Sequence, residues 1–187
     1  MYESKPLPSL TKSIVTGAIG FCVVSVCVFA TVAFAERWMY QNLGMFGSYI
    51  AWIVLFILLS GAVFGSLVVG RWRLPQFYLL WTLAFFGYAA AWMVAYFTLG
   101  PTKGEIVGAL AGSILMALVI ATGFRTLTSA LKLSAVLFVS NSLGYFLGAT
   151  LFEHLNEPTG MLLFGVVYGL FFGAGIGAAL QLVQNHK

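Results

Sequence analysis

Six long apolar runs take up most of the chain, and they constrain its fold more than any other feature. Each run is long enough to cross a hydrocarbon layer, which takes about 20 helical residues. We place the six expected spans near residues 12–36, 47–70, 75–99, 104–124, 131–153 and 160–183. The sequence therefore predicts an all-α polytopic membrane protein with six transmembrane helices.

The connections between these runs are too short to hold a soluble domain, which usually takes about 50 residues or more. Proline and glycine occur where the runs end, at Pro75, Gly100 and Pro158. Only 7% of the 187 residues are charged, whereas roughly 25% are charged in a typical soluble domain. We expect residues 1–187 to form a single transmembrane domain.

The first apolar run has some features of a cleaved signal peptide. Lys5 and Lys12 precede it, and it ends in "AFAE", which resembles a signal-peptidase site. Its apolar part, however, exceeds the 7–15 residues of a typical signal core. We therefore expect it to be retained as the first helix.

The distribution of basic residues predicts the orientation of the chain. Of the nine basic residues, only Arg37 and Lys103 fall on the side of the first, third and fifth connections. The others fall on the side of both termini: Lys5, Lys12, Arg71, Arg73, Arg125, Lys132 and Lys187. By the positive-inside rule, both termini are cytoplasmic, in what we expect to be a bacterial inner (plasma) membrane. The net charge of +4 thus reports orientation and does not indicate nucleic-acid binding.

Glycines at four-residue spacing mark the second, fourth and sixth spans. They are Gly61, Gly65, Gly104, Gly108, Gly112, Gly165, Gly169, Gly173 and Gly177. Each costs a helix about 1 kcal/mol relative to alanine, but small residues let membrane helices approach closely and pack tightly. We expect these strips to pack against helices of the same chain, with a homo-oligomer or a partner subunit as the alternative.

A weak internal repeat suggests how the spans are arranged. The segments "FFGYAAAW" and "NSLGYFLGAT" share a Gly-Tyr pair 57 residues apart, and Glu36 and Glu153, 117 residues apart, each end an odd-numbered span. Chance similarity between apolar segments is the alternative explanation. The repeat predicts three tandem helical hairpins, packed through the glycine strips and related by an axis along the membrane normal.

Ionisable residues are almost absent from the spans. The chain has no aspartate, and no charged residue falls near the middle of a span. This pattern argues against a proton-relay pump, a voltage sensor or a redox-driven carrier. The deepest polar residue, Asn141, is expected to form an interhelical hydrogen bond, with the lining of a pocket as the alternative. Tyr88 and Tyr145 are placed to reach the same level, either for binding or as core aromatics.

The remaining polar residues gather in the connections opposite the termini. The candidate ligand-binding residues are Glu36, Arg37, Asn141, Tyr145, Glu153, His154 and Glu157. If the fifth helix continues through its loop, Glu153 and Glu157 share one face at i and i+4. A zinc site normally needs a better-defined ligand set than this, so we predict no metal. A solvated loop with local ion pairs is the alternative for this cluster.

Motifs of catalysis and nucleotide binding are absent. The segment "GAGIG" resembles a phosphate loop only in composition, because it lies within a span. No Gly-x-Ser-x-Gly motif and no histidine pair at metal spacing occurs. Cys22 and Cys27 are expected to be packing residues. We predict no catalytic residue, and the sequence indicates no cofactor.

In its length, six spans, cytoplasmic termini and the segment "GPTKGEIVGALAG", the chain resembles in general features the substrate-binding components of energy-coupling-factor vitamin transporters. This resemblance implies a vitamin-like ligand and a separate coupling subunit. We expect a non-enzymatic transport-type or small-solute-binding protein, with a site between helices at the extracytoplasmic mouth. The alternatives are an accessory, assembly or structural subunit of a larger membrane complex and, less favoured, a small membrane enzyme.

Overall fold

The computed structural model describes residues 6–69 and 74–185, and this part of the chain is helical apart from short turns. The helices are α1 (Leu10–Gly65), α2 (Leu74–Leu99), α3 (Pro101–Phe124), α4 (Ala130–His154) and α5 (Thr159–Asn185), with a 3-10 turn at Leu127–Ser129. All five α-helices in the described residues are long and apolar enough to cross a membrane. The fold is thus an all-α bundle suited to a bilayer.

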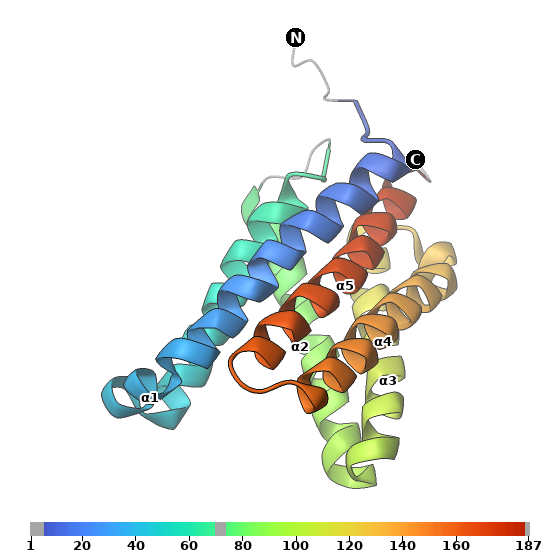
Figure 1. Ribbon diagram of the computed structural model, residues 1–187. Helices are drawn as coiled ribbons and strands as arrows, with labels where there is room; N and C mark the ends of the chain where they lie inside the picture. The colour runs from blue at the N-terminus through green and yellow to red at the C-terminus, as the bar shows by residue number, and fades with distance from the viewer. Residues whose placement is uncertain (1–5, 70–73, 186–187) are drawn as a thin grey trace.

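Helix α1 contains both of the first two expected spans. A straight helix of its 56 residues would be about 84 Å long at 1.5 Å per residue. Instead, Gly44 adopts a non-helical conformation with φ of 69°, and the ring of Phe21 lies 5.3 Å from those of both Phe56 and Phe64. The chain therefore turns back at Gly44, which divides α1 into a first arm (10–43) and a second arm (45–65) (Figure 1).

The expected count of six helices is not what the described chain shows. The predicted connection "RWMYQNLGMF", residues 37–46, is helical on both sides of Gly44 rather than a loop. Because a single glycine with positive φ makes the reversal, no longer loop is needed there. The first two expected spans therefore appear as one interrupted helix, and five long helices result.

The helices pack side by side in an order that leaves α1 and α2 with little mutual contact. Helix α5 lies between α1 and α4, while α3 packs against α2 on one side and α4 on the other (Figure 1). The contact between α1 and α2 is the least extensive of these neighbouring pairs. Helices α1 and α2 thus share less surface than the other neighbouring pairs.

The glycine strip of α5 packs against α1, not against α4, its partner in the expected hairpin. Gly169 lies against the backbone of Cys22, and a Cβ added to Gly173 would collide with the carbonyl oxygen of Gly17. Gly177 lies in the same way against Ser13. Membrane helices associate closely where small residues meet, so this strip joins the two ends of the chain.

The other two strips both face α2. A Cβ on Gly108 would lie 3.0 Å from the Trp92 Cα, so the Gly104–Gly108–Gly112 strip packs within its expected hairpin. Gly61, by contrast, lies against the Tyr78 ring, in the next expected hairpin. The scheme in which each strip closes its own hairpin is therefore not confirmed.

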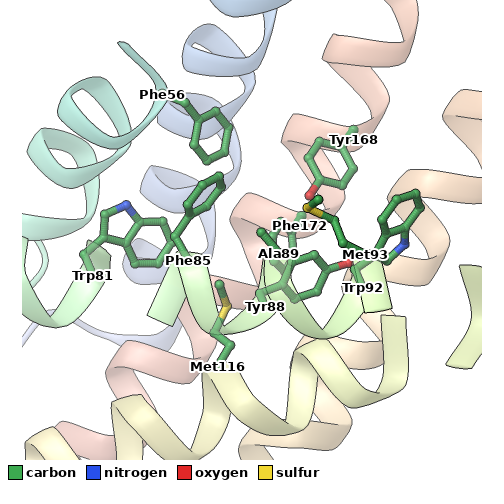
Figure 2. Close-up of a pocket in the computed structure, with 10 residues that line it drawn as sticks. All are labelled: Phe56, Trp81, Phe85, Tyr88, Ala89, Trp92, Met93, Met116, Tyr168 and Phe172. Atoms are coloured by element: carbon green, nitrogen blue, oxygen red, sulfur yellow. The ribbon is translucent and has the colours of Figure 1, made fainter. Parts of the chain in front are cut away.

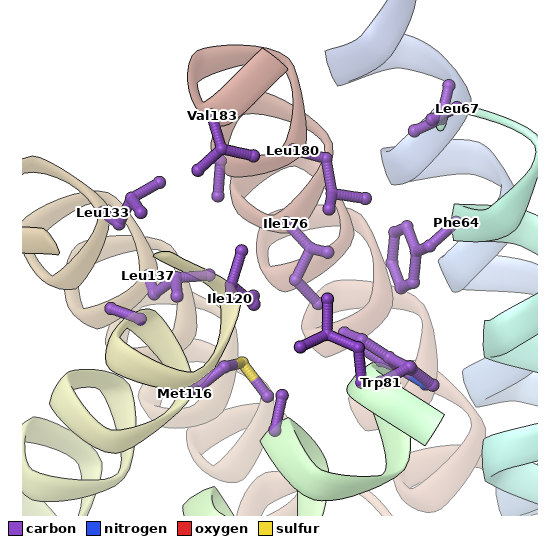
Figure 3. Packing of buried hydrophobic residues seen from close by; sticks show 14 of the residues in the cluster. Phe64, Leu67, Trp81, Met116, Ile120, Leu133, Leu137, Ile176, Leu180 and Val183 are labelled. Carbon is purple, nitrogen blue, oxygen red and sulfur yellow. The ribbon is translucent and has the colours of Figure 1, made fainter. Parts of the chain in front are cut away.

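Large apolar side chains fill one half of the bundle, which we call the closed half. It holds the start of α1 and the end of α5, and its core includes Phe64, Trp81, Ile120 and Ile176 (Figure 3). The side chain of Gln184 on α5 also joins the segment that follows α1, because its Oε1 accepts a 2.8 Å hydrogen bond from the Val69 amide. Shape-filling contact of this kind gives the closed half a continuous core.

The opposite half, which we call the open half, has few large buried side chains. Its buried apolar residues on α2 to α5 are glycine or alanine: Ala95, Gly104, Gly108, Ala109, Gly144, Gly148, Gly160 and Gly165. These residues let pairs of helices touch but cannot fill space between pairs. Figure 1 shows that the helix ends spread apart in this half.

Large apolar side chains also cover the outside of the bundle. Ile19 and Val23 on α1 are 59% and 57% exposed, and Leu79 and Leu83 on α2 are 63% and 55% exposed. Each pair is spaced by four residues, so each forms part of a continuous helix face. Monomeric soluble proteins rarely expose apolar surface this extensive, and the exposed faces suit lipid.

Candidate functional site

The seven predicted ligand-binding residues lie in three separate places. The first is the reversal of α1, where Glu36 and Arg37 are exposed. Glu36 interacts with Tyr40, whose ring centroid lies 5.9 Å from that of Trp52. The Trp52 ring is also 5.6 Å from Tyr49. Aromatic side chains of α1 itself thus occupy the space beside this pair.

The second place is the turn between α4 and α5, which holds Glu153, His154 and Glu157. All three are exposed, and the His154 Nδ1 lies 2.7 Å from the carbonyl oxygen of Thr150. The helix does not continue through this turn, since α4 ends at His154, so Glu153 and Glu157 do not share a helix face. Pro158 disfavours helical geometry in the residue before it, which is consistent with a helix end here.

Metal-ligating side chains do not cluster in the part of the chain that the structure describes. No group of three or more His, Cys, Asp or Glu residues is close enough there to hold an ion. In particular, the three residues at the turn between α4 and α5 do not form such a group.

The third place is the interior of the bundle, which holds Asn141 and Tyr145. Asn141 is 1% exposed, and its side chain interacts with the hydroxyl of Tyr88 on α2. Its Oδ1 has no hydrogen-bond partner. Tyr145 interacts with Glu105 of α3, and its ring packs 6.4 Å from that of Trp92. Polar side chains of α4 therefore meet α2 at the buried Asn141 and α3 at the half-buried Tyr145.

A pocket of about 200 Å³ lies beside this interior pair, where α1 and α2 part. Towards the closed half, the two helices are joined by a 2.8 Å hydrogen bond from Trp81 Nε1 to Ser60 Oγ. The rings of Phe56 and Phe85 are 5.0 Å apart. Phe56 and Phe85 line the pocket together with Trp92, which lies further along α2. The pocket thus adjoins these contacts between α1 and α2.

Side chains from four helices line this pocket, which we call the aromatic pocket because α1, α2 and α5 all contribute rings to it, while α3 contributes Met116. The lining residues are Phe56, Trp81, Phe85, Tyr88, Ala89, Trp92, Met93, Met116, Tyr168 and Phe172. Figure 2 shows Phe56 and Phe85 on one side, with Tyr88 and Tyr168 on the other. Both tyrosines carry hydroxyls, and none of the ten residues is charged. An apolar lining with a few polar groups is typical of small-molecule sites.

The sequence builds one wall of the pocket from a stripe on α2. Trp81, Phe85, Tyr88 and Trp92 recur at intervals of four, three and four residues, which places them on one helix face. On the neighbouring helix, Gly108 lies against Trp92 and lets the stripe approach α3 closely. The stripe therefore faces the interior and not lipid.

Sequence reasoning singled out only Tyr88 among the ten lining residues. The helical period of the aromatic stripe was the signal that could have identified three more, namely Trp81, Phe85 and Trp92. No comparable local signal marks Phe56, because its place in the pocket depends on the reversal of α1.

A second pocket, of about 430 Å³, lies at the closed end of the bundle. It is formed by the segment before α1, the first turns of α1 and the residues that follow the second arm, including Pro6, Ser9, Lys12, Thr16 and Ser66. The Ser9 hydroxyl accepts a 3.2 Å hydrogen bond from the Lys12 amide and caps α1. Much of this polar surface thus serves the start of the helix.

Comparison with protein-family models, with curated proteins and with solved structures finds no match for this chain.

Proposed function

We propose that the chain is a transport-type or small-solute-binding membrane protein whose ligand occupies the aromatic pocket. The position of this pocket supports the proposal, because the pocket lies among four helices and at the boundary between the closed and open halves. Small-molecule sites form preferentially between helices of bundles, and most of their lining is apolar. The proposal keeps the expected location between helices but moves the ligand inward from the charged connections.

We further propose that the chain crosses the bilayer six times. The two arms of α1 run in opposite directions from Gly44, so each arm serves as one crossing, and α2 to α5 supply four more. Lys12, Arg125 and Lys132 lie at the closed end, near helix starts and ends. By the positive-inside rule, the closed end faces the cytoplasm of a bacterial inner membrane. Arg71 and Arg73, which support the same orientation, lie outside the described residues.

In this orientation the open half faces away from the cytoplasm, and a solute enters the pocket from that side. Glu105 and Tyr145 border the route, since they interact with each other and Tyr145 packs on the pocket residue Trp92. A partner subunit that supplies energy fits this scheme. We assign no catalytic step, because the lining offers no general acid or base other than phenol hydroxyls.

Ligand-dependent stability tests the proposal. Thermal unfolding of the detergent-solubilised protein is measured against a broad panel of small molecules at several concentrations. A ligand present at 100 times its Kd should stabilise the protein by about 2.7 kcal/mol. We expect at least one compound to raise the Tm in this concentration-dependent way.

Two matched variants locate the binding site. Ala89 lines the pocket, whereas its neighbour Ala90 on α2 is exposed on the outside of the bundle. Ala89→Leu fills the pocket and should abolish the ligand-dependent shift, while Ala90→Leu should retain it. An equal ligand-dependent rise in Tm in both variants would show that the ligand does not bind in this pocket. If no compound shifts the wild-type protein, an accessory or structural subunit becomes the better explanation.

A further inference from the structure

We infer that the aromatic pocket selects an uncharged molecule of one or two fused rings that carries a single hydrogen-bonding group. This inference rests on the proposed function, since it assigns a ligand class to the same pocket. Three properties of the lining support it: its size, its lack of charge and the placement of its hydroxyls.

The size of the pocket limits the ligand to a small molecule. Its volume is about 200 Å³. A dry apolar cavity of about 150 Å³ holds a benzene molecule, whereas sites for drug-sized ligands usually measure about 300–1,000 Å³. The pocket therefore suits one ring or two fused rings.

The lining favours a flat ring over a branched aliphatic molecule. Seven of the ten lining residues are aromatic, and rings attract one another in offset-stacked or edge-to-face arrangements. Met93 and Met116 add flexible, polarisable contacts at the sides. A planar guest can contact several rings at once in such a site.

The absence of charge in the lining selects against ionised molecules. A charge transferred out of water needs a partner to replace its hydration. Glu105, the acidic residue of this region, interacts with Tyr145 and is not part of the lining. Ring faces do attract cations, so a cationic molecule is the strongest competitor and is included in the test.

The hydroxyls place one polar contact on a single side of the pocket. Tyr88 and Tyr168 lie on the side opposite Phe56 and Phe85 (Figure 2). The buried Asn141 interacts with the Tyr88 hydroxyl, and its own Oδ1 has no hydrogen-bond partner. A hydroxyl both donates and accepts hydrogen bonds, so a ring N–H or O–H directed to this side is satisfied.

Three probes that share one ring test the charge selectivity at pH 7: indole, which is neutral, tryptamine, a cation, and indole-3-acetate, an anion. Binding to the full chain in detergent is measured by titration calorimetry and by thermal unfolding. Ala89→Leu corrects for partition into detergent, and Ala90→Leu is the matched control. We expect saturable indole binding in the wild type and in Ala90→Leu only, with both charged probes at least tenfold weaker.

A fourth probe tests the polar contact. Indene has nearly the shape of indole but lacks the N–H. In Tyr168→Phe, which removes one hydroxyl and keeps the ring, indole should bind roughly two- to tenfold more weakly, the range expected for one hydrogen bond. Indene binding should stay unchanged. An equal loss for indole and indene would contradict the polar contact.

The outcomes separate the ligand class from the proposed function. If tryptamine or indole-3-acetate binds as tightly as indole and Ala89→Leu abolishes that binding, the ligand class is wrong while the pocket remains the site. The ligand class is also wrong if only charged or larger compounds bind there. If no compound of any class binds in a way that Ala89→Leu abolishes, the proposed function fails as well.

Discussion

The closed and open halves of the bundle use aromatic side chains in opposite ways. In the closed half, Phe64 and Trp81 lie 5.0 Å apart and pack into a core with Ile120 and Ile176. Towards the open half, Tyr88 and Trp92 continue the same stripe of α2, yet they border the pocket, which begins at Trp81. The aromatic stripe of α2 therefore does not by itself determine whether a packed core or a cavity forms beside it.

The second arm of α1 makes the difference. In the closed half it presents small residues to α2, and Gly61 accommodates the Tyr78 ring while the Ser60 hydroxyl pairs with Trp81. Nearer Gly44 it presents Trp52, which packs on Tyr40 and Tyr49 of α1 itself. Because Trp52 is held within α1, it does not fill the space beside the α2 stripe.

The largest expected effect comes from the glycine contact that holds the closed half together. A methyl group on Gly173 would collide with the Gly17 backbone, whereas one on Gly87 would make only an ordinary contact at 3.8 Å. We expect Gly173→Ala to lower the free energy of unfolding by about 3 kcal/mol or more. Gly87→Ala should leave it unchanged or raise it by up to about 1 kcal/mol. Thermal unfolding in detergent measures both, and equal effects would contradict the packing described.

The next prediction makes one substitution in each half of the same helix. Ala84 is fully buried in the closed core, while Ala89 lines the pocket. Ala84→Leu should destabilise the protein by about 1–3 kcal/mol through overpacking. Ala89→Leu should be neutral or stabilising by about 1 kcal/mol, because it buries methylene groups in free space. A comparable loss of Tm in both variants would contradict the claim that Ala84 lies in a filled core and Ala89 beside free space.

A third prediction concerns the polar link between α1 and α2. Ser60→Ala leaves the buried Trp81 N–H without its 2.8 Å hydrogen bond, which should cost about 1–3 kcal/mol. Ser66 is exposed and bonds only within its own helix end, so Ser66→Ala should change stability by less than about 0.5 kcal/mol. Chemical or thermal unfolding of the pair checks this link, and indistinguishable curves would show that it does not stabilise the bundle.

The smallest effect is expected from the charged turn between α4 and α5. Glu153, His154 and Glu157 are exposed, so replacing all three by glutamine should change stability by less than about 1 kcal/mol. Ligand-dependent stabilisation should also persist, because the pocket lies in the bundle interior. Loss of that stabilisation in an otherwise folded variant would indicate that the ligand binds at the extracytoplasmic mouth, as expected from the sequence.

Much of the fold could be predicted because bilayer crossing leaves a strong apolar signal. The spans expected near 75–99, 104–124, 131–153 and 160–183 correspond to α2 to α5. A connection between the first two spans was expected near residues 37–46, but the sequence did not indicate that Gly44 alone, with its positive φ, makes the turn while both sides stay helical. The helices that pack against the glycine strips of α1 and α5 were also not predicted correctly. The four-residue spacing shows that one helix face carries small residues, but it does not show which helix packs there.

The candidate site was harder to predict than the fold. Charged residues drew attention to the connections, where Glu36, Arg37, Glu153, His154 and Glu157 are all exposed. Asn141 was identified because an amide inside a membrane span is rare, but its contact with Tyr88 on α2 requires the tertiary structure. The pocket exists because side chains of α1 leave space beside the α2 stripe. The sequence of α2 alone does not indicate how closely another helix packs against it.

The most direct test is to locate a bound probe in an experimental structure. Crystals or frozen grids of the full chain with 5-bromoindole would reveal the bromine as a strong feature. The account predicts density for the probe between Phe56 and Phe85 on one side and Tyr88 and Tyr168 on the other, with the closed half unchanged. A pocket filled by protein side chains, with the probe bound only at the outer turn near His154, would contradict it.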